Sequence, residues 1–156
     1  MTTSVIEGPT IDSFEIRQEI VIEAPIEIAF QTVLDVLGPE GEMPDGKPFP
    51  MKLEAWPGGR WYRDLGDNAG HLWGHVQAIK PPTLIELWGP LMMSFATCNN
   101  LQYRLAADGD VTRVTFHHRG AGAMIRDQQG GFADGWGYWI GHMKDLAERR
   151  HRGDRT

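Results

Sequence analysis

The stretch that decides the fold reads QQGGFADGWGYWIGHMKDL, from Gln128 to Leu146. Its apolar residues recur at steps of three and four, the period of a helix with one apolar face: Phe132, Trp136, Trp139, Ile140, Met143, Leu146 and Ala147. The same segment holds five glycines, and each glycine inside a helix costs about 0.8–1 kcal/mol relative to alanine. Such a helix needs a large surface to pack on. We therefore expect it to lie on a curved sheet, with its aromatic side chains beside a cavity.

The first part of the chain predicts a strand and a short helix. Apolar and charged residues alternate from Phe14 to Ile22, the period of a half-buried strand. Pro25 is suited to open a helix, an apolar stripe follows, and Gly38 is placed to end it. Residues 38–50, GPEGEMPDGKPFP, are rich in glycine and proline and predict a long loop.

Short strands separated by turn residues fill the middle of the chain. The candidates are 51–56, 60–66, 72–80, 83–88, 95–106 and 111–119. Pro57-Gly58-Gly59 marks one turn, and Asp108-Gly109 fits a tight hairpin. The order is strand, helix, consecutive antiparallel strands and one long helix, which is typical of an α+β domain with helices on one face of the sheet.

Composition excludes several classes of function. The 156 residues suffice for one domain with a full core. The formal net charge of −6 argues against nucleic acid or an anionic membrane as a partner. A single cysteine, Cys98, allows no intrachain disulfide, and Met1 to Thr10 has no signal-peptide pattern. No apolar run approaches the length that spans a bilayer. We expect a cytoplasmic protein.

Several landmarks together resemble the START-like or SRPBCC superfamily, in the branch named for the activator of the heat-shock-protein-90 ATPase. They are Ala24-Pro25, Pro57-Gly58-Gly59-Arg60, Trp73-Gly74-His75-Val76 before Lys80-Pro81-Pro82, Thr112 to His118, and Gly135-Trp136. The resemblance implies the helix-grip fold, in which a seven-stranded antiparallel sheet wraps around the C-terminal helix and leaves a ligand cavity between them. It implies a single domain over residues 12–150, with loose tails at 1–11 and 151–156.

Polar residues within the predicted cavity are the first candidates for a site. Strand parity places Asn99 on one face with Phe95 and Tyr103, and His118 on one face with Phe116. If both faces look inward, each polar side chain needs a hydrogen-bond partner, which a ligand oxygen can supply. Alternatively, Asn99 and His118 bond to each other, to Tyr103 or to a buried water. The predicted ligand-binding set is Phe95, Asn99, Tyr103, Phe116, His118, Phe132, Trp136 and Trp139.

The strand over 72–80 leaves one question open. Trp73 and His75 share one face by parity, while Leu72, Gly74 and Val76 share the other. The pattern does not decide which face lines the cavity. Gly74 itself indicates a bulge or a close backbone approach.

Metal and catalytic signatures are weak. His71 and His75 lie about 13 Å apart on a strand, too far for one ion, and His117 and His118 point to opposite faces. No nucleophile elbow or phosphate-binding glycine loop is present. Cys98 has the opposite parity from Asn99, which disfavours a pair with His118. We expect no metal, no cofactor and no catalytic residue.

The preferred interpretation is a protein that binds a small, largely hydrophobic molecule between its sheet and its C-terminal helix. One alternative is a cochaperone-like interaction module, which predicts surface positions for Trp56, Trp61, Trp73 and Trp88 because interfaces favour aromatic anchors. Another is a cyclase or hydrolase that uses a cavity histidine as a base. A dimer formed through an exposed strand edge is a further expectation.

Overall fold

The computed structural model describes residues 1–123 and 129–153. The elements are β1 (Asp12–Ile22), α1 (Ile26–Leu37), β2 (Lys52–Leu53), β3 (Arg60–Gly66), β4 (Ala69–Lys80), β5 (Leu84–Gly89), β6 (Thr97–Asp108), β7 (Val111–Gly122) and α2 (Gln129–His151). The strands form one sheet of seven in the order β1-β7-β6-β5-β4-β3-β2, and every neighbouring pair is antiparallel. The predicted α+β helix-grip architecture is confirmed.

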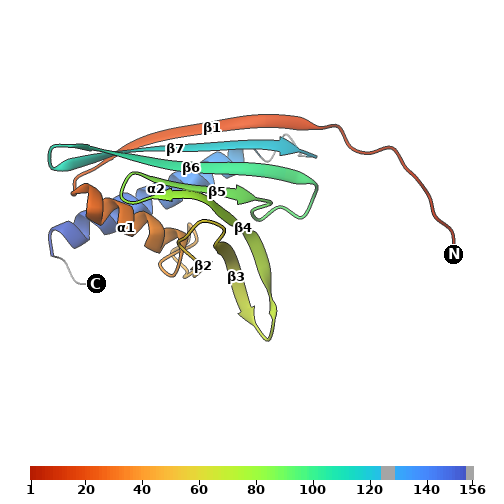
Figure 1. Cartoon of the computed structure of the whole chain (residues 1–156), viewed down its shortest axis with the longest axis horizontal. Helices are drawn as coiled ribbons and strands as arrows, with labels where there is room; N and C mark the ends of the chain where they lie inside the picture. The colour runs from red at the N-terminus through yellow and green to blue at the C-terminus, as the bar shows by residue number, and fades with distance from the viewer. Residues whose placement is uncertain (124–128, 154–156) are drawn as a thin grey trace.

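Both helices lie on the same side of the curved sheet (Figure 1). α1 begins after Pro25 and ends at Gly38, as predicted from the sequence. Asp108 pairs with Val111 across the predicted hairpin, where Gly109 has a φ of 63°. Residues 1–11 form no helix or strand and are exposed.

Several strand boundaries differ from the prediction. β4 begins at Ala69 rather than Leu72, because Asp67 and Asn68 form the turn with φ values of 52° and 60°. Asparagine and aspartate tolerate this left-handed region better than other residues with a side chain. The predicted strand over 51–56 shortens to Lys52–Leu53, because the chain turns between Glu54 and Gly59.

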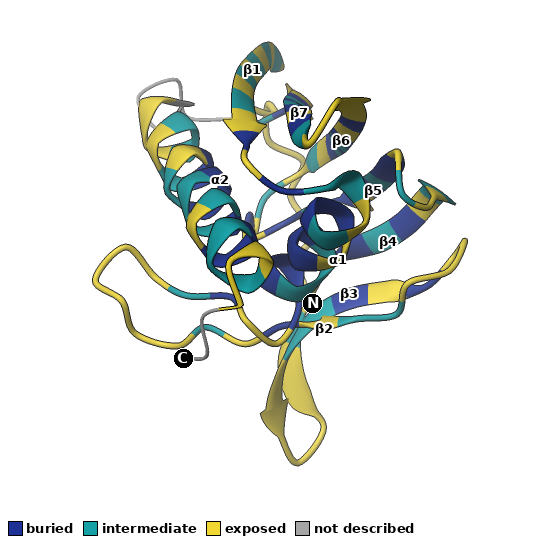
Figure 2. Cartoon of the chain, turned by 90° about the vertical axis from the view of Figure 1, so that its left-hand side faces the viewer, coloured by how far each residue is buried: buried dark blue, intermediate teal, exposed yellow. Residues whose placement is uncertain are grey.

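α2 packs its apolar face against the sheet and α1, and its other face is exposed (Figure 2). The buried residues of α2 are those of the predicted stripe: Trp136, Trp139, Ile140, Met143, Leu146 and Ala147, with Phe132 partly buried. The burial of this stripe compensates for the weak helix propensity of the glycines. The long helix predicted from a glycine-rich sequence is thus explained by its tertiary packing.

The loop over residues 38–50 is held by hydrogen bonds to itself and to α2. It folds back at residues 43–47, and Glu42 and Pro48 form an isolated bridge. The Glu42 backbone carbonyl accepts a hydrogen bond from the Trp139 indole at 2.9 Å, and the Glu42 carboxylate accepts one from the Tyr138 hydroxyl at 2.6 Å. This hydrogen bond raises the pKa of Tyr138. The loop therefore lies against the first half of α2.

Candidate functional site

An apolar pocket opens where the 38–50 loop, β4, the segment after β5 and the start of α2 meet. It has a volume of about 320 Å³. We call it the aromatic pocket, and its lining residues are Met43, Pro44, Phe49, Trp73, Met92, Gly131, Phe132, Gly135, Trp136 and Trp139. Sites for small molecules in proteins are typically concave, mostly apolar and of this size or larger.

Three indoles form the inner wall of the aromatic pocket. Trp73 and Trp139 are nearly parallel, with ring centroids 6.1 Å apart and an angle of 9° between their planes. Trp136 meets Trp139 edge-on at 5.8 Å. Such offset and edge-to-face arrangements are the favourable ones for aromatic pairs. The wall is therefore a packed aromatic surface rather than a set of independent side chains.

Two of the three indole N–H groups in this wall donate hydrogen bonds to other residues of the protein. The Trp139 indole donates to the carbonyl of Glu42, and the Trp136 indole donates to Nδ1 of His118 at 2.9 Å. Within the residues that the structure describes, the Trp73 indole makes no hydrogen bond. Among the three indoles of this wall, Trp73 is thus the one whose N–H has no partner in the described residues.

His118 lies behind Trp136 and completes a buried hydrogen-bond chain. Because its Nδ1 accepts the Trp136 proton, its Nε2 carries the hydrogen and donates to Oδ1 of Asn99 at 2.8 Å. The Asn99 amide group donates to the carbonyl of Gly89 at 3.1 Å. Burial lowers the pKa of His118 to about 4, so the ring is neutral at pH 7.

The structure therefore shows the alternative in which Asn99 and His118 bond to each other. Neither residue lines the aromatic pocket, and both ring nitrogens of His118 are engaged. A general base needs a nitrogen free to take a proton from a substrate. This geometry does not support the cyclase or hydrolase interpretation through His118.

The other predicted site residues fall into two groups. Phe132, Trp136 and Trp139 line the aromatic pocket. Tyr103 and Phe116 are fully buried behind it, with Phe116 in contact with both Tyr103 and Trp136. Phe95 precedes β6 rather than lying in it, and lines a shallow hollow beside the pocket with Met92 and Phe132.

A β-bulge in β4 decides which residues of this strand face the pocket. Trp61 pairs with Gly74 whereas Tyr62 pairs with Leu72, so Trp73 is an extra residue in the strand. The bulge separates Trp73 and His75, which simple alternation places on one face. Trp73 is buried and lines the pocket, whereas His75 packs against the half-exposed Trp88, with ring centroids 5.9 Å apart.

Gly74 has the close backbone approach that its position indicates. A Cβ at this residue would lie 2.3 Å from the carbonyl oxygen of Trp88. Only glycine allows β4 and β5 to approach each other in this way.

Of the ten residues that line the aromatic pocket, three belong to the predicted ligand-binding set: Phe132, Trp136 and Trp139. Met43, Pro44 and Phe49 come from the 38–50 loop, Met92 follows β5, and Trp73 enters through the bulge. Loop residues carry no periodic signal, so strand and helix patterns do not reveal them. The available signals were the length of the loop and the Met92-Met93 pair after Gly89-Pro90.

Exposure separates the four tryptophans that the interaction-module interpretation places at the surface. Trp56 and Trp88 are 57% and 47% exposed, but Trp61 is fully buried and Trp73 is 5% exposed. The Trp61 indole donates to the carbonyl of Leu37 at 2.7 Å, so it belongs to the core. The expectation of four surface tryptophans is therefore wrong for Trp61 and Trp73.

Within residues 1–123 and 129–153, no three His, Cys, Asp or Glu side chains cluster as ligands for a metal ion. In the same part of the chain, no helix is long and apolar enough to cross a membrane.

Several solved protein structures have a fold similar to that of this chain. No protein-family model and no curated protein sequence matches the chain. Among solved structures, an uncharacterised protein from Rhizobium leguminosarum superposes with a TM-score of 0.69 and 17% identity, over 90% of this chain and 97% of that one. The Aha1 dimer from Colwellia psychrerythraea has a TM-score of 0.60 and 17% identity, over 86% of this chain and 96% of that one.

A third similar structure is the di-domain ARO/CYC protein StfQ from the steffimycin biosynthetic pathway. It has a TM-score of 0.63 and 9% identity, and the match covers 88% of this chain but 51% of StfQ. At these identities the comparisons show the fold. This chain has the helix-grip fold, and the Aha1 dimer is among its structural neighbours.

Proposed function

We propose that this protein binds a small, flat, largely apolar molecule in the aromatic pocket. The observation that carries the proposal is an open hollow of about 320 Å³ whose inner wall consists of Trp73, Trp136 and Trp139. An apolar ligand that covers this wall gains free energy in proportion to the apolar area removed from water.

The geometry of the wall supports a planar shape for the proposed ligand. Trp73 and Trp139 present nearly parallel rings, which suits an aromatic or otherwise planar molecule. Met43 and Met92 at the rim have flexible thioether side chains that adapt to ligands of different outline. The Trp73 N–H suits one acceptor atom, such as a carbonyl oxygen, on an otherwise apolar ligand.

The structural neighbours support this kind of function. StfQ, whose fold resembles this chain, belongs to the steffimycin biosynthetic pathway, and a further neighbour is CalU16 from Micromonospora echinospora. The fold in StfQ thus occurs in a protein of small-molecule biosynthesis. In this chain the contacts of His118 favour binding over catalysis.

The first test is native mass spectrometry of the purified protein, followed by denaturing extraction of any bound molecule. We expect a small hydrophobic adduct that is lost on denaturation. The matched variants are Met92→Glu, which places a charge at the rim, and Leu65→Glu on the exposed β3 strand end. An adduct retained equally by both variants would contradict the proposed location.

A second test uses two probes of similar shape, 2-acetylnaphthalene and 2-ethylnaphthalene, in equilibrium dialysis. Both are expected to bind the wild-type protein, the ketone more tightly because it can accept the Trp73 hydrogen bond. Trp73→Phe should remove this preference while both probes still bind. If neither probe nor any extracted molecule binds, the proposal fails.

Two exposed indoles favour a second candidate, a protein-interaction module. Trp56 and Trp88 keep about half of their surface in water, and interfaces favour such anchors. The test is co-sedimentation with a purified heat-shock-protein-90 ATPase. Binding that is lost in Trp88→Ala but kept in Met92→Glu would favour this function over the aromatic pocket.

A further inference from the structure

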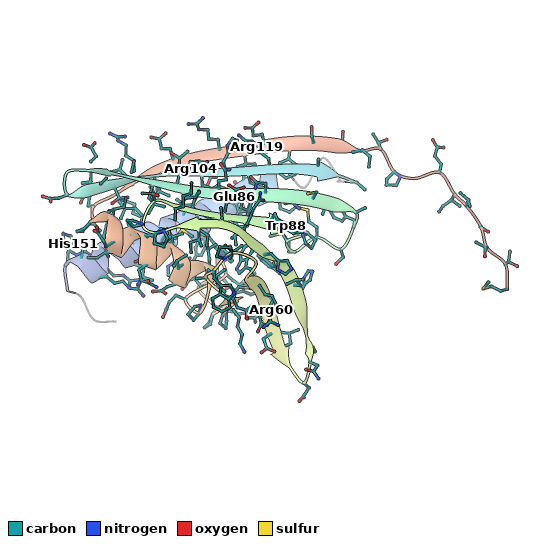
Figure 3. The ribbon with its side chains drawn as sticks, viewed as in Figure 1. Arg60, Glu86, Trp88, Arg104, Arg119 and His151 are labelled. Carbon is teal, nitrogen blue, oxygen red and sulfur yellow. The ribbon has the colours of Figure 1, made fainter. Side chains whose placement is uncertain are left out.

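A second hollow lies on the opposite face of the sheet and has a different chemistry. It has a volume of about 350 Å³ and is lined by side chains from β1, β6 and β7. We call it the basic hollow, and its lining residues are Arg17, Gln102, Arg104, Thr115, His117 and Arg119. Figure 3 shows Arg104 and Arg119 on neighbouring strands of this part of the sheet.

Strand register explains why these side chains meet. Arg17, His117 and Gln102 lie directly opposite one another on β1, β7 and β6. Arg119 is two residues from His117 and is a diagonal neighbour of Arg17, while Arg104 is a diagonal neighbour of His117. Diagonal partners about 7–8 Å apart are within reach of long side chains. Three arginines therefore surround one point on the sheet.

No carboxylate is among the residues that line the basic hollow. The nearby carboxylates lie at its edge and contact other side chains. Glu15 contacts His117 and lies 3.5 Å from Arg119 Nε. Glu86 accepts hydrogen bonds from the amides of Asn100 and Gln102 at 3.0 and 2.8 Å.

Two of the three arginines form no ion pair within the described part of the chain, while Glu15 and Glu19 flank Arg17 on β1 and Glu86 is a diagonal neighbour of Arg104. In the described part of the chain, the Arg17 side chain makes no ion pair or hydrogen bond, and the Arg104 guanidinium donates only to the side-chain amide oxygen of Gln102, at 3.4 Å. Like charges placed close together on a sheet destabilise it.

We propose that the basic hollow binds a phosphate group, held by the guanidinium groups of Arg17, Arg104 and Arg119 and by the Thr115 hydroxyl. Guanidinium forks form two parallel hydrogen bonds to phosphate oxygens, and a hydroxyl adds a further donor. A phosphate dianion also offsets the charges that the protein leaves unpaired. The site is on the face away from the aromatic pocket, so it is independent of the proposed hydrophobic ligand.

The test is isothermal titration calorimetry of the full chain with inorganic phosphate at constant ionic strength. We expect saturable binding in the wild-type protein. The double variant Arg17→Gln/Arg104→Gln should bind roughly tenfold or more weakly, since it removes two charge-assisted contacts. The control is Arg113→Gln on β7, because Arg113 faces Glu19 and Asp108 and does not line the hollow. This control should bind within about twofold of the wild type.

Two sources of the phosphate group are separated by vesicle sedimentation. Binding to phosphatidylcholine vesicles containing phosphatidic acid, lost in the double variant, would assign a lipid phosphate. Binding of inorganic phosphate without vesicle binding would assign a soluble phosphate. The proposal is overturned if phosphate does not saturate the wild type, if the double variant binds equally well, or if an aspartate-rich peptide competes as strongly as phosphate.

Discussion

The two halves of α2 perform different tasks, and their sequences differ accordingly. The pocket half, residues 129–141, holds five glycines and contributes Phe132, Trp136 and Trp139 to the aromatic pocket. The anchor half, residues 142–151, has no glycine and packs against β1 and α1. One helix thus joins a segment of weak helix propensity to one of ordinary propensity.

Specific polar contacts hold the anchor half. Arg150 lies 2.7 Å from Asp35 of α1 and donates to the Thr32 hydroxyl at 3.1 Å. Lys144 donates to the carbonyl of Val21 at 2.9 Å, and Glu148 accepts from the backbone N–H of Glu23 at 2.9 Å. These contacts fix the end of the helix against the edge strand and α1.

The glycines of the pocket half have few close neighbours that require them. A Cβ at Gly130, Gly131, Gly135 or Gly141 would meet no atom within 4 Å. Gly131 and Gly135 instead line the aromatic pocket, where the missing side chains leave space. The pocket half therefore combines weak helix propensity with open space beside the aromatic pocket, whereas polar contacts to α1 and the end of β1 hold the anchor half.

The largest effect is expected from Met143→Ala in the anchor half. Met143 is 1% exposed in the core, and loss of such a side chain costs about 2–5 kcal/mol. Urea unfolding should show this loss, while the protein that remains folded should bind the naphthalene probes with unchanged affinity. A large loss of probe affinity would break the division between the two halves.

Acid should lower the free energy of unfolding, because His118, which accepts a hydrogen bond from Trp136 of the pocket half, is neutral in the folded protein. The folded protein holds the pKa of His118 near 4, below its ordinary value of about 6.5 in an unfolded chain. The unfolded state therefore binds the proton first as the pH falls. The stability linked to the neutral His118 is fully present above pH 6.5. It is lost as the pH falls from 6.5 to 4, by at most about 1.4 kcal/mol per pH unit.

The measurement is the free energy of unfolding between pH 7 and pH 4, compared with that of His118→Gln. The glutamine variant should be less stable at pH 7 but should lack this part of the pH dependence. An identical pH profile in both proteins would assign the effect to other groups, such as Glu148, whose pKa is also lowered in the folded state.

Tyr103→Phe tests the core behind the pocket half. Within the described structure, the buried Tyr103 hydroxyl has no hydrogen-bond partner, and burial raises its pKa. A buried polar group without a partner is costly. We expect the free energy of unfolding of the phenylalanine variant to be about 1 kcal/mol higher than that of the wild type. Thermal or urea unfolding measures this difference. A destabilised variant would show that the hydroxyl has a partner, such as a buried water.

The smallest effects come from a pair of alanine substitutions on α2. Gly135→Ala and Gly141→Ala should each stabilise the protein by about 0.8–1 kcal/mol, since both sites are helical and unobstructed. Only Gly135 lines the aromatic pocket, so only Gly135→Ala should weaken probe binding. Equal probe affinities in the two variants would refute the role of the glycines in making room.

The sequence predicted the elements that follow a period. The stripe from Trp136 to Ala147 specified α2, and the signals at Pro25 and Gly38 specified the ends of α1. Strand alternation grouped Asn99 with Tyr103 and His118 with Phe116, and the burial of these residues shows that both faces look inward. These features depend on local spacing, which a sequence displays directly.

Other parts of the site depend on contacts between distant segments. Alternation placed Trp73 with His75. Gly74 indicated a bulge or a close backbone approach, but the register between β3 and β4 is what places the bulge at Trp73 and separates the two residues. The pairing of Asn99 with His118 was one of several alternatives, because sequence does not show which buried groups meet. Phe49 reaches the pocket through the path of an aperiodic loop.

The aromatic wall has an optical consequence. Trp61, Trp73, Trp136 and Trp139 form a chain of neighbouring indoles with centroid separations between 5.2 and 6.1 Å. At such separations the excited states of the rings interact, so near-ultraviolet circular dichroism and emission arise from the group as a whole. Trp56 and Trp88 are the two exposed indoles and serve as an internal reference. The grouped indoles therefore give the aromatic pocket an intrinsic optical signal, without any added label.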